Sequence, residues 1–316
     1  MSVSTLFKVL MLALLSFEVI SANVESPKLY PKDFGDAVQF HAKFANREWT
    51  YEMKRPIPKI CGPETKAFIG ILSAPSYFDK RQAIRQSWMH DKSNPDGYPS
   101  FFFIGHTDDT ALEAELIEEQ KKYGDIIRYN VVDAYDMLPV KTHAILSWHQ
   151  EFCPTVPYLL KTDDDTVVYL KRLDYFMKTE FDQVKEKHPA TLFCNRADNH
   201  RPFRSPANKY FVSFEAYSEN VYPTFCLGGS YLVSAESARS LLDHARDVQF
   251  LHLEDVLFTG LIARKADVHQ YDTPVFSRSL GEFAGSNKVQ SVKVDIPTDQ
   301  IAKAYQKLKK MCIKHY

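Results

Sequence analysis

Several features that would assign this 316-residue chain to a particular class are missing from it. Lysine and arginine total 39 against 40 aspartates and glutamates, so the net charge is -1 at pH 7. Without a basic excess there is no electrostatic footprint for a polyanion, which argues against a nucleic-acid-binding protein. The five cysteines form no CxxC pair, which argues against a structural zinc site. The sequence contains no Asn-x-Ser/Thr, so N-glycosylation is not expected.

The N-terminal part also lacks a hydrophobic run as long as an ordinary membrane span. An apolar run covers residues 9–17, between Lys8 and Glu18, whereas a span needs about 20 apolar residues. Small residues follow it, which is typical of a cleavable signal peptide over residues 1–22. A short uncleaved signal-anchor is the alternative, and a buried helix is a third. The first two predict entry into the secretory pathway.

The five cysteines can form disulfides if the chain enters the secretory pathway. In an oxidising lumen the five cysteines predict one or two disulfides, with at least one thiol left over. Their connectivity stays open. The cysteines are Cys61, Cys153, Cys194, Cys226 and Cys312.

What the chain does contain is a globular composition with an alternating pattern. It is 45% hydrophobic and 25% charged, which is ordinary for a folded domain. Five prolines between residues 23 and 65 predict an irregular lead-in or stem. From residue 66, apolar runs of strand length alternate with helical patterns, which predicts an α/β fold with a mostly parallel sheet flanked by helices. Strands are expected over 67–74, 100–105, 125–132, 157–162, 191–195 and 228–234, and helices over 77–89, 108–124, 140–152, 235–246, 254–266 and 297–311.

The segment LLKTDDDTVVYL, residues 159–170, places three aspartates after a predicted strand. In extended chain, Asp163 and Asp165 point to one face and Asp164 to the other. Two carboxylates on one face suit a hard cation such as Mg²⁺ or Mn²⁺, and ligands of α/β sheets bind beyond the carboxyl ends of strands. One alternative is a solvated turn whose aspartates cap the next helix. Another is the DxDx(T/V) string of haloacid-dehalogenase-type phosphatases.

Two further segments carry candidate residues. Glu254 and Asp255 open a predicted helix, where the helix dipole favours carboxylates whether or not they are catalytic. Gly228 and Gly229 precede a predicted strand. Glycine lets the backbone approach a ligand closely, and a plain turn is the alternative.

Arg81 and Arg85 lie one helical turn apart in RQAIRQSW, residues 81–88. Residues at this spacing share a helix face. Two guanidinium groups there can bind an anion, and a solvated helix face is the alternative.

Together these segments resemble the β-1,3-glycosyltransferases of glycosyltransferase family 31, the β-1,3-galactosyltransferase and β-1,3-N-acetylglucosaminyltransferase-like group. They follow the family's order from about residue 66 to 276, and the joint pattern is specific where each piece alone is weak. The segments are RQAIRQSW, FFIG (102–105), YGDII (123–127), DAYDMLPVKT (133–142), LLKTDDDTVV (159–168), YPTFCLGGSYLVS (222–234) and EDVLFTG (254–260).

The resemblance implies an α/β fold of the GT-A type. A Rossmann-like donor half would cover about 66–170 and an acceptor half about 171–316. It implies an inverting hexosyltransferase that uses a UDP-sugar donor, Mn²⁺ or another divalent cation, and a glycan acceptor on glycoprotein or glycolipid. The family works in the Golgi, so a Golgi enzyme is expected, membrane-anchored if the N-terminal segment is uncleaved.

The resemblance also implies roles for individual residues. Asp255 matches the catalytic base. The residues implied to bind the donor are Arg81, Arg85, Lys141, Asp163, Asp164, Asp165, Gly228 and Gly229, with Asp163 and Asp165 as metal ligands.

The sequence departs from the family late in the chain. Many members carry a metal-binding histidine before the last helix, where this chain has Lys293. A protonated lysine cannot ligate a metal, but it can contact a diphosphate as a charge. His269 is the nearest upstream histidine and is the alternative ligand. This departure keeps open a non-enzymatic relative, a folding helper or glycan-binding protein on the same scaffold.

Overall fold

The computed structural model describes residues 33–57, 59–277 and 292–312. The predicted signal peptide or anchor, residues 1–22, lies outside these ranges. Within them, no helix combines the length and the apolar character that crossing a membrane requires.

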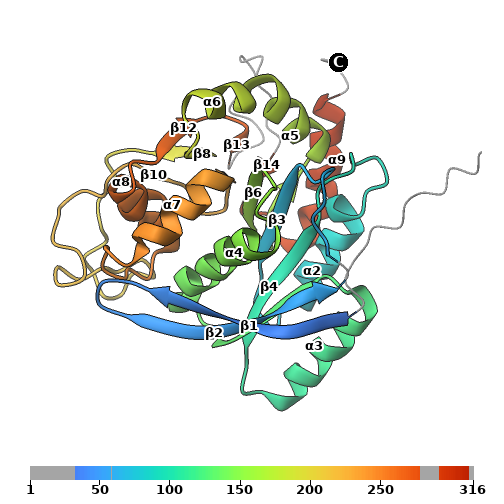
Figure 1. The fold of residues 1–316 in the computed structure, drawn as a ribbon, viewed down its shortest axis with the longest axis horizontal. Helices are drawn as coiled ribbons and strands as arrows, with labels where there is room; N and C mark the ends of the chain where they lie inside the picture. Colours follow the sequence, from blue (N-terminus) through green and yellow to red (C-terminus); the bar gives the residue numbers. More distant parts are fainter. Residues whose placement is uncertain (1–32, 58, 278–291, 313–316) are drawn as a thin grey trace, which may run out of the picture.

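A mixed sheet runs through the described part of the chain (Figure 1), with nine strands in the order β1-β2-β5-β4-β3-β6-β11-β8-β12. The four central strands, β5, β4, β3 and β6, are parallel to one another. Strand β11 is antiparallel to β6 and to β8, and β12 returns parallel to β8. The strands are β1 (Asp33–Lys43), β2 (Glu48–Ile57), β3 (Ala67–Leu72), β4 (Ser100–His106), β5 (Ile126–Val132), β6 (Tyr158–Asp163), β8 (Thr191–Cys194), β11 (Ser230–Ser234) and β12 (His269–Asp272).

Helices cover both faces of this sheet (Figure 1), which confirms the predicted α/β class. Most predicted helices and strands are present within a few residues of their expected bounds. The α-helices are α2 (Phe78–Ile84), α3 (Thr110–Tyr123), α4 (Leu138–Phe152), α5 (Leu170–Phe176), α6 (Asp182–Lys187), α7 (Ala235–Ala245), α8 (Ala263–Lys265) and α9 (Ile301–Cys312). The π- and 3₁₀-helical segments are η1 (Arg85–Met89), η2 (Tyr135–Met137), η3 (Met177–Phe181), η4 (Val256–Ile262) and η5 (Thr298–Gln300). Short strands outside the main sheet are β7 (Val167–Val168), β9 (Arg196–Ala197), β10 (Phe225–Cys226), β13 (Phe276–Ser277) and β14 (Val292–Lys293).

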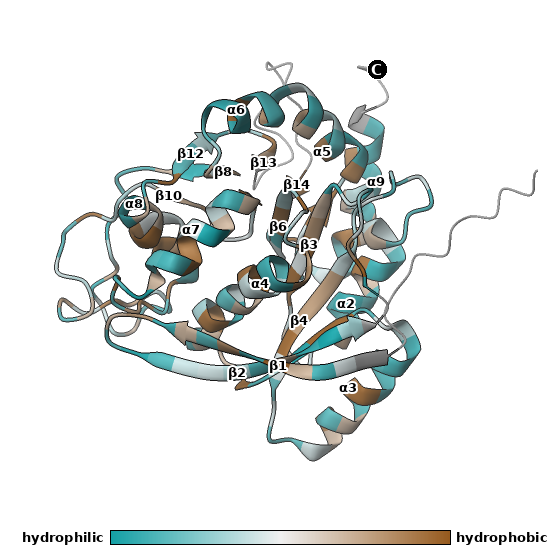
Figure 2. Cartoon of the chain, in the orientation of Figure 1, coloured by the Kyte–Doolittle hydropathy of each residue, from teal (hydrophilic) through white to brown (hydrophobic). Residues whose placement is uncertain are grey.

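The central strands are apolar on both sides, and Figure 2 shows β3 and β4 largely in brown. In β4, Phe101 and Phe103 belong to one buried cluster, while Phe102 and Ile104 belong to the other. Successive strand residues point to opposite faces, so a strand covered twice must be apolar throughout. This explains the unbroken run that predicted the strand.

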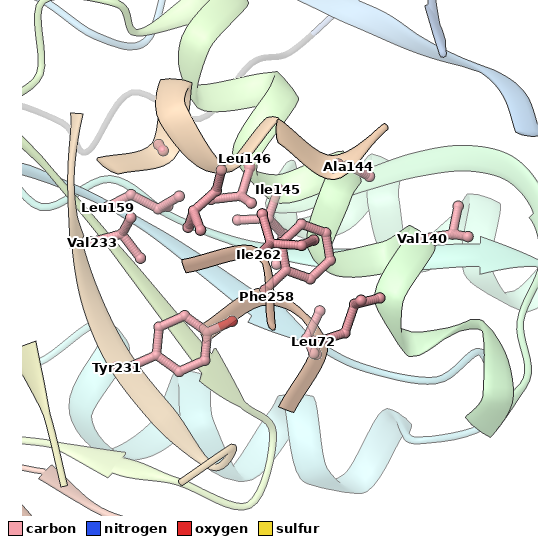
Figure 3. Close-up of a cluster of buried hydrophobic side chains, with 14 of the residues drawn as sticks. Leu72, Val140, Ala144, Ile145, Leu146, Leu159, Tyr231, Val233, Phe258 and Ile262 are labelled. Atoms are coloured by element: carbon pink, nitrogen blue, oxygen red, sulfur yellow. The ribbon is translucent and has the colours of Figure 1, made fainter. Parts of the chain in front are cut away.

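The first cluster joins α4 to the sheet and to η4 (Figure 3). Ile145 and Leu146 of α4 meet Leu159 and Val233 of the sheet, and Phe258 of η4 closes the cluster. The second cluster lies on the opposite face, under α2, α5 and α9. The site described below lies where the strands between these clusters end.

The lead-in predicted over residues 23–65 is not irregular throughout. Strands β1 and β2 form an antiparallel hairpin that extends the sheet beyond β5. Within this part of the chain the prolines fall outside the hairpin or at its end, and Ala42, Tyr51 and Met53 are buried against the core. The division of the chain into lead-in, donor half and acceptor half stays a prediction.

Two disulfides connect the described cysteines. Cys61 pairs with Cys153, and Cys194 pairs with Cys226. The prediction of one or two disulfides is confirmed. The second joins the end of β8 to β10, at the border of the candidate site.

Candidate functional site

A cavity of about 710 Å³ opens at the carboxyl ends of β3 and β6. Parallel strands present their carboxyl ends at one edge, where helices and loops diverge and leave room for a ligand. Most of the predicted site residues line it: Lys141, Asp163, Asp164, Asp165, Gly228, Gly229 and Asp255. Segments about 90 residues apart in the sequence therefore meet around one cavity.

The aspartate triplet forms the turn that ends β6. The Asp163 amide donates to the Gly229 carbonyl at 3.1 Å, and the Thr166 amide donates back to Asp163 O at 3.2 Å. Helix α5 begins after Tyr169, which has no side-chain capping bond. The triplet does not cap this helix, so the solvated-cap interpretation is wrong.

The three carboxylates face different partners. Asp163 accepts from Lys161 Nζ at 2.9 Å, and Asp164 Oδ1 accepts from Lys80 Nζ at 2.9 Å. The other Asp164 oxygen, Oδ2, is buried and has no hydrogen-bond partner among the described residues. Burial, with repulsion from nearby carboxylates, raises the pKa of Asp163 and of Asp165 to about 6. A cation would stabilise all three as anions.

Lys161 links this turn to the opposite wall of the cavity. Its buried Nζ donates to Asp163 at 2.9 Å, to the Gly228 carbonyl at 2.6 Å and to Glu254 at 2.7 Å. Burial disfavours its charge, but the two carboxylates outweigh this and hold the pKa of Lys161 above its usual value. No functional role was predicted for Lys161. Its signal is a lysine inside an apolar strand, which must find anionic partners when it is buried.

Glu254 and Asp255 are adjacent but differ in surroundings. Glu254 Oε1 accepts from Lys161, while Oε2 accepts from Thr142 Oγ1 at 3.0 Å and from the Tyr231 hydroxyl at 3.1 Å. Both oxygens of the Glu254 carboxylate therefore accept hydrogen bonds from buried side chains.

Asp255 is the N-cap of the π-helical segment η4, and its Oδ1 accepts from the Val256 amide at 2.8 Å. The alternative interpretation, that Asp255 serves as a carboxylate at a helix N-terminus, therefore holds for Oδ1. The other oxygen, Oδ2, accepts no hydrogen bond from the described residues and lies against Gly228. Burial raises the pKa of Asp255, which favours its acting as a proton acceptor near neutral pH.

The two glycines make room for different neighbours. A Cβ on Gly228 would lie 2.9 Å from Asp255 Oδ2, and a Cβ on Gly229 would lie 2.7 Å from Val294 Cβ. Neither position tolerates a side chain without displacement of its neighbour. The glycine at 228 thus keeps the backbone close to the Asp255 carboxylate.

Arg81 and Arg85 are not brought to the cavity, contrary to the donor-binding role predicted for them. Both are buried, and both bind Glu119 at 2.6 Å. Arg85 also binds Asp125, at 2.7 Å. The solvated-face interpretation is wrong, because both side chains are buried, and a direct donor-binding role stays a prediction. A buried guanidinium needs an anion, and here Glu119 of helix α3 and Asp125, the residue before β5, supply it.

Arg81 still reaches the site indirectly. It donates to the carbonyls of Ala74 and Pro75 at 2.7 and 3.2 Å, and Ala74 lines the cavity. Arg81 thus holds the loop after β3 from behind.

Lys141 lines the cavity as predicted. Its buried Nζ donates to Asp133 at 2.7 Å and to the Ser73 carbonyl at 2.7 Å. Burial lowers its pKa, although Asp133, Asp164 and Asp163 oppose this. The amine therefore lies near the triplet but is bound to its own carboxylate.

The late part of the chain returns to the triplet. Strand β14 pairs antiparallel with β7, so that Lys293 is opposite Val167, and the Ile296 amide donates to Asp165 O at 2.8 Å. The Lys293 side chain lies outside the described residues. His269 is in β12 at the sheet edge, stacked on His188 with ring centroids 4.2 Å apart. It does not line the cavity, so the fold does not bring His269 to the aspartate triplet.

Over the residues that the structure describes, no group of three or more histidine, cysteine, aspartate or glutamate side chains is arranged to hold a metal. The unpartnered Asp164 oxygen and the raised carboxylate pKa values do fit a cation in this turn. The ligand set predicted from Asp163 and Asp165 stays a prediction.

Comparison with known proteins defines the class of this chain. A family model described as galactosyltransferase matches residues 79–274, and the chain belongs to that family. It is 31% identical over 202 residues to β-1,3-galactosyltransferase 1 of Mus musculus and of Homo sapiens, which covers 63% of this chain and 60% of theirs. It is 30% identical over 208 residues to β-1,3-galactosyltransferase 5 of Gorilla gorilla gorilla, which covers 65% and 68%.

The family resemblance read from the motifs is thereby confirmed. The phosphatase interpretation of DDDTV is set aside. The matched part spans about 60% of the length of the mouse and human relatives.

Proposed function

We propose that this protein is an inverting glycosyltransferase that moves a hexose, with galactose first among the candidates, from a UDP-sugar to a glycan acceptor in β-1,3 linkage. One observation carries the proposal. A single cavity joins the acidic end of β6 to Asp255 and the glycine pair. Family membership and the names of the similar proteins support it.

The proposed fold is of the GT-A type. Its support is the parallel run β5-β4-β3-β6, with the acidic turn at the carboxyl end of β6 and the cavity beyond it. In such sheets a nucleotide binds beyond the carboxyl ends of the strands. The donor's diphosphate would lie near the aspartate triplet and Lys141.

The chemistry divides between the two walls. Asp255 takes the proton of the acceptor hydroxyl, whose oxygen bonds to the anomeric carbon as the bond from that carbon to UDP breaks. Attack opposite the leaving group converts an α-linked donor into a β-linked product. UDP leaves with the bonding electron pair and its charge needs neutralisation.

Asp163 and Asp165, with the unpartnered oxygen of Asp164 beside them, would hold a divalent cation such as Mn²⁺. When bound, the cation supplies positive charge for the leaving diphosphate. The protein's part is to hold these carboxylates ionised and in place, through Lys80 and Lys161.

The deciding experiment is a donor screen on the purified protein. UDP release would be measured with UDP-galactose, UDP-N-acetylglucosamine and UDP-N-acetylgalactosamine, with Mn²⁺ or with EDTA, and with simple galactosides and glucosaminides as acceptors. We expect acceptor-dependent release with one donor and its loss in EDTA. Absence of release with every pair would refute the proposal.

The acidic turn can be tested in the same assay. Asp165→Asn should lower turnover at least about a hundredfold and weaken UDP binding, since an amide is a poor ligand for a hard cation. Asp243→Asn, an exposed aspartate on α7, is the matched control and should match the wild type. A fully active Asp165→Asn variant would show that this carboxylate is not a ligand.

We further propose that the protein works in the secretory pathway, in the Golgi. The two disulfides support an oxidising compartment. A reporter carrying residues 1–30 should enter the endoplasmic reticulum. A cytosolic reporter would contradict this.

A further inference from the structure

The cavity has an aromatic wall in addition to its acidic one. Eight large apolar side chains are exposed in the described part of the chain, and four of them line this cavity. Exposed apolar side chains that gather in one place, rather than scatter, mark a binding surface. The four are Tyr77, Tyr135, Phe203 and Tyr210.

Three of them form one surface, which we call the aromatic platform: Tyr135, Phe203 and Tyr210. The rings of Phe203 and Tyr210 are 6.1 Å apart and inclined by 37°. Lys209 Nζ lies 4.5 Å from the Tyr135 ring centroid and 5.4 Å from that of Tyr210, which joins the two. The three side chains are 43%, 52% and 44% exposed.

The platform lies next to the candidate base. Partial burial, then Tyr210 and then the Asp255 carboxylate raise the pKa of Tyr135 to about 12, so both groups are within electrostatic reach of Tyr135. Tyr222 lines the same wall, and its buried hydroxyl has no hydrogen-bond partner among the described residues. A ligand hydroxyl would supply one.

The segment that carries Phe203 and Tyr210 is held in place before any ligand binds. Arg204 donates to the carbonyls of Val212, Ser213 and Glu219 at 2.8 to 2.9 Å. The Val212 amide donates to the Phe203 carbonyl at 2.9 Å. Such pre-organisation lowers the entropy cost of binding.

We propose that the aromatic platform is the acceptor subsite, and that it binds a neutral hexopyranose through a face of C–H bonds. A pyranose presents such faces, which gain dispersion and hydrophobic contact against aromatic rings. Its rim hydroxyls then point past the rings, toward Asp255 and Tyr222. The assignment to the acceptor rests on the proposed transferase function. The sugar-binding test does not, because it measures binding without turnover.

The platform is assigned to the acceptor rather than to the donor's uracil because of the fourth aromatic residue. Lys80 Nζ lies 4.2 Å from the Tyr77 ring centroid and 2.9 Å from Asp164, so Tyr77 belongs to the acidic wall. A flat base bound there would leave the platform free for a sugar.

The test is saturation-transfer NMR on the full chain, with methyl β-D-galactopyranoside and methyl N-acetyl-β-D-glucosaminide as probes. We expect at least one glycoside to receive saturation, strongest on the protons of one ring face. Phe203→Ala and Tyr210→Ala should each weaken its binding about tenfold, whereas Tyr210→Phe should bind normally.

The control is Tyr175→Ala, since Tyr175 is 44% exposed on α5 and does not line the cavity. It should bind the probe as the wild type does. The proposal that the platform binds a sugar would be refuted if neither glycoside binds to the wild type. It would also be refuted if wild type, Phe203→Ala and Tyr210→Ala bind equally.

Kinetics separate this inference from the proposed function. In an active enzyme, Phe203→Ala should raise the acceptor KM about tenfold and leave the donor KM unchanged. A raised donor KM instead would show that the platform binds the donor, and would overturn the inference. If no donor is consumed but the platform variants still lose the probe, the transferase proposal fails and the sugar site stands. If the enzyme transfers sugar but Phe203→Ala leaves the acceptor KM unaltered, the transferase proposal stands and the assignment of the platform as acceptor subsite fails.

Discussion

Asp255 and Glu254 show how far two adjacent carboxylates can differ. Glu254 is bound to Lys161, Thr142 and Tyr231, whereas among the described residues the Asp255 carboxylate accepts from the Val256 amide alone, at Oδ1. A group that accepts a proton from a substrate needs a free lone pair within reach of it. At the residue scale, this difference supports the proposal that Asp255 is the base and that Glu254 supports it.

Asp255→Asn should therefore lower kcat by about 10²–10⁴-fold, the usual contribution of a general base, with UDP binding retained. Glu254→Gln should cost less in kcat and more in stability, because Lys161 loses a buried anionic partner. The measurements are kcat for both variants, donor affinity by calorimetry and thermal melts. Normal turnover of Asp255→Asn, or a defect confined to donor binding, would show that another group is the base.

Lys161 should act as the centre of a coupled network. Lys161→Met leaves Asp163 and Glu254 without their shared cation, and we expect a loss of about 3–5 kcal/mol in the free energy of unfolding. The double variant Lys161→Met/Glu254→Gln should recover part of it, since it removes one uncompensated charge. Urea denaturation of wild type, both single variants and the double variant measures the coupling. Strictly additive losses would mean that the two residues act independently.

At the scale of elements, the loop before β11 lies between the two walls of the cavity. Its glycines contact different structures, Gly228 the side chain of Asp255 and Gly229 the backbone-proximal part of Val294. A side-chain end can rotate away from an added methyl group, but a Cβ cannot move without its backbone.

We accordingly expect Gly228→Ala to lower kcat at least about tenfold with little change in melting temperature, because it displaces the Asp255 carboxylate. Gly229→Ala should instead destabilise the fold by about 1–3 kcal/mol, the usual cost of overpacking. Thermal melts and kcat for both variants distinguish the two effects. Equal effects of both substitutions on both quantities would contradict this division.

At the scale of the whole molecule, two buried histidines tie stability to pH. His143 bonds to the Tyr51 hydroxyl at 2.8 Å, and His149 Nε2 bonds to the Val156 carbonyl at 3.1 Å. Burial lowers the pKa of His143 to about 3 and that of His149 to about 4. Both are thus neutral in the folded chain, where an unfolded histidine has a pKa of about 6.5.

Below about pH 6.5 the unfolded chain binds protons that the folded chain does not. The stability from each neutral histidine is complete above that pH and falls by about 1.4 kcal/mol per pH unit below it. Asp163 and Asp165 act in the opposite direction, because their raised pKa values favour proton binding by the folded chain below about pH 6.

The measurement therefore compares how steeply the free energy of unfolding changes with pH in the wild type and in a histidine variant. Denaturation at several values between pH 7.5 and 5.0 should give a smaller acid-induced loss of stability for His143→Gln than for the wild type. Identical slopes would show that His143 is solvated or already charged in the folded protein.

Much of the fold and part of the site could be predicted because their signals are local. The run FFFI of β4 and the alternating helices are periodic patterns within single elements. Asp163, Asp164 and Asp165 end β6 at the sheet edge, and that position follows from the strand pattern alone. The hairpin of residues 33–57 was not predicted, because the five prolines of residues 23–65 indicated an irregular segment. In the structure these prolines fall outside the hairpin or at its end.

The sequence by itself determined the order of elements, the acidic strand end and the family, each of which rests on neighbouring residues. Only the tertiary structure decided which charges face the cavity. Arg81 and Arg85 match a donor motif, yet Glu119 and Asp125 neutralise them inside the protein. Lys161 carried no motif role, yet it joins both walls of the cavity. The reason is physical: a buried charge requires an opposite charge close in space, and chain separation does not reveal which residue will supply it.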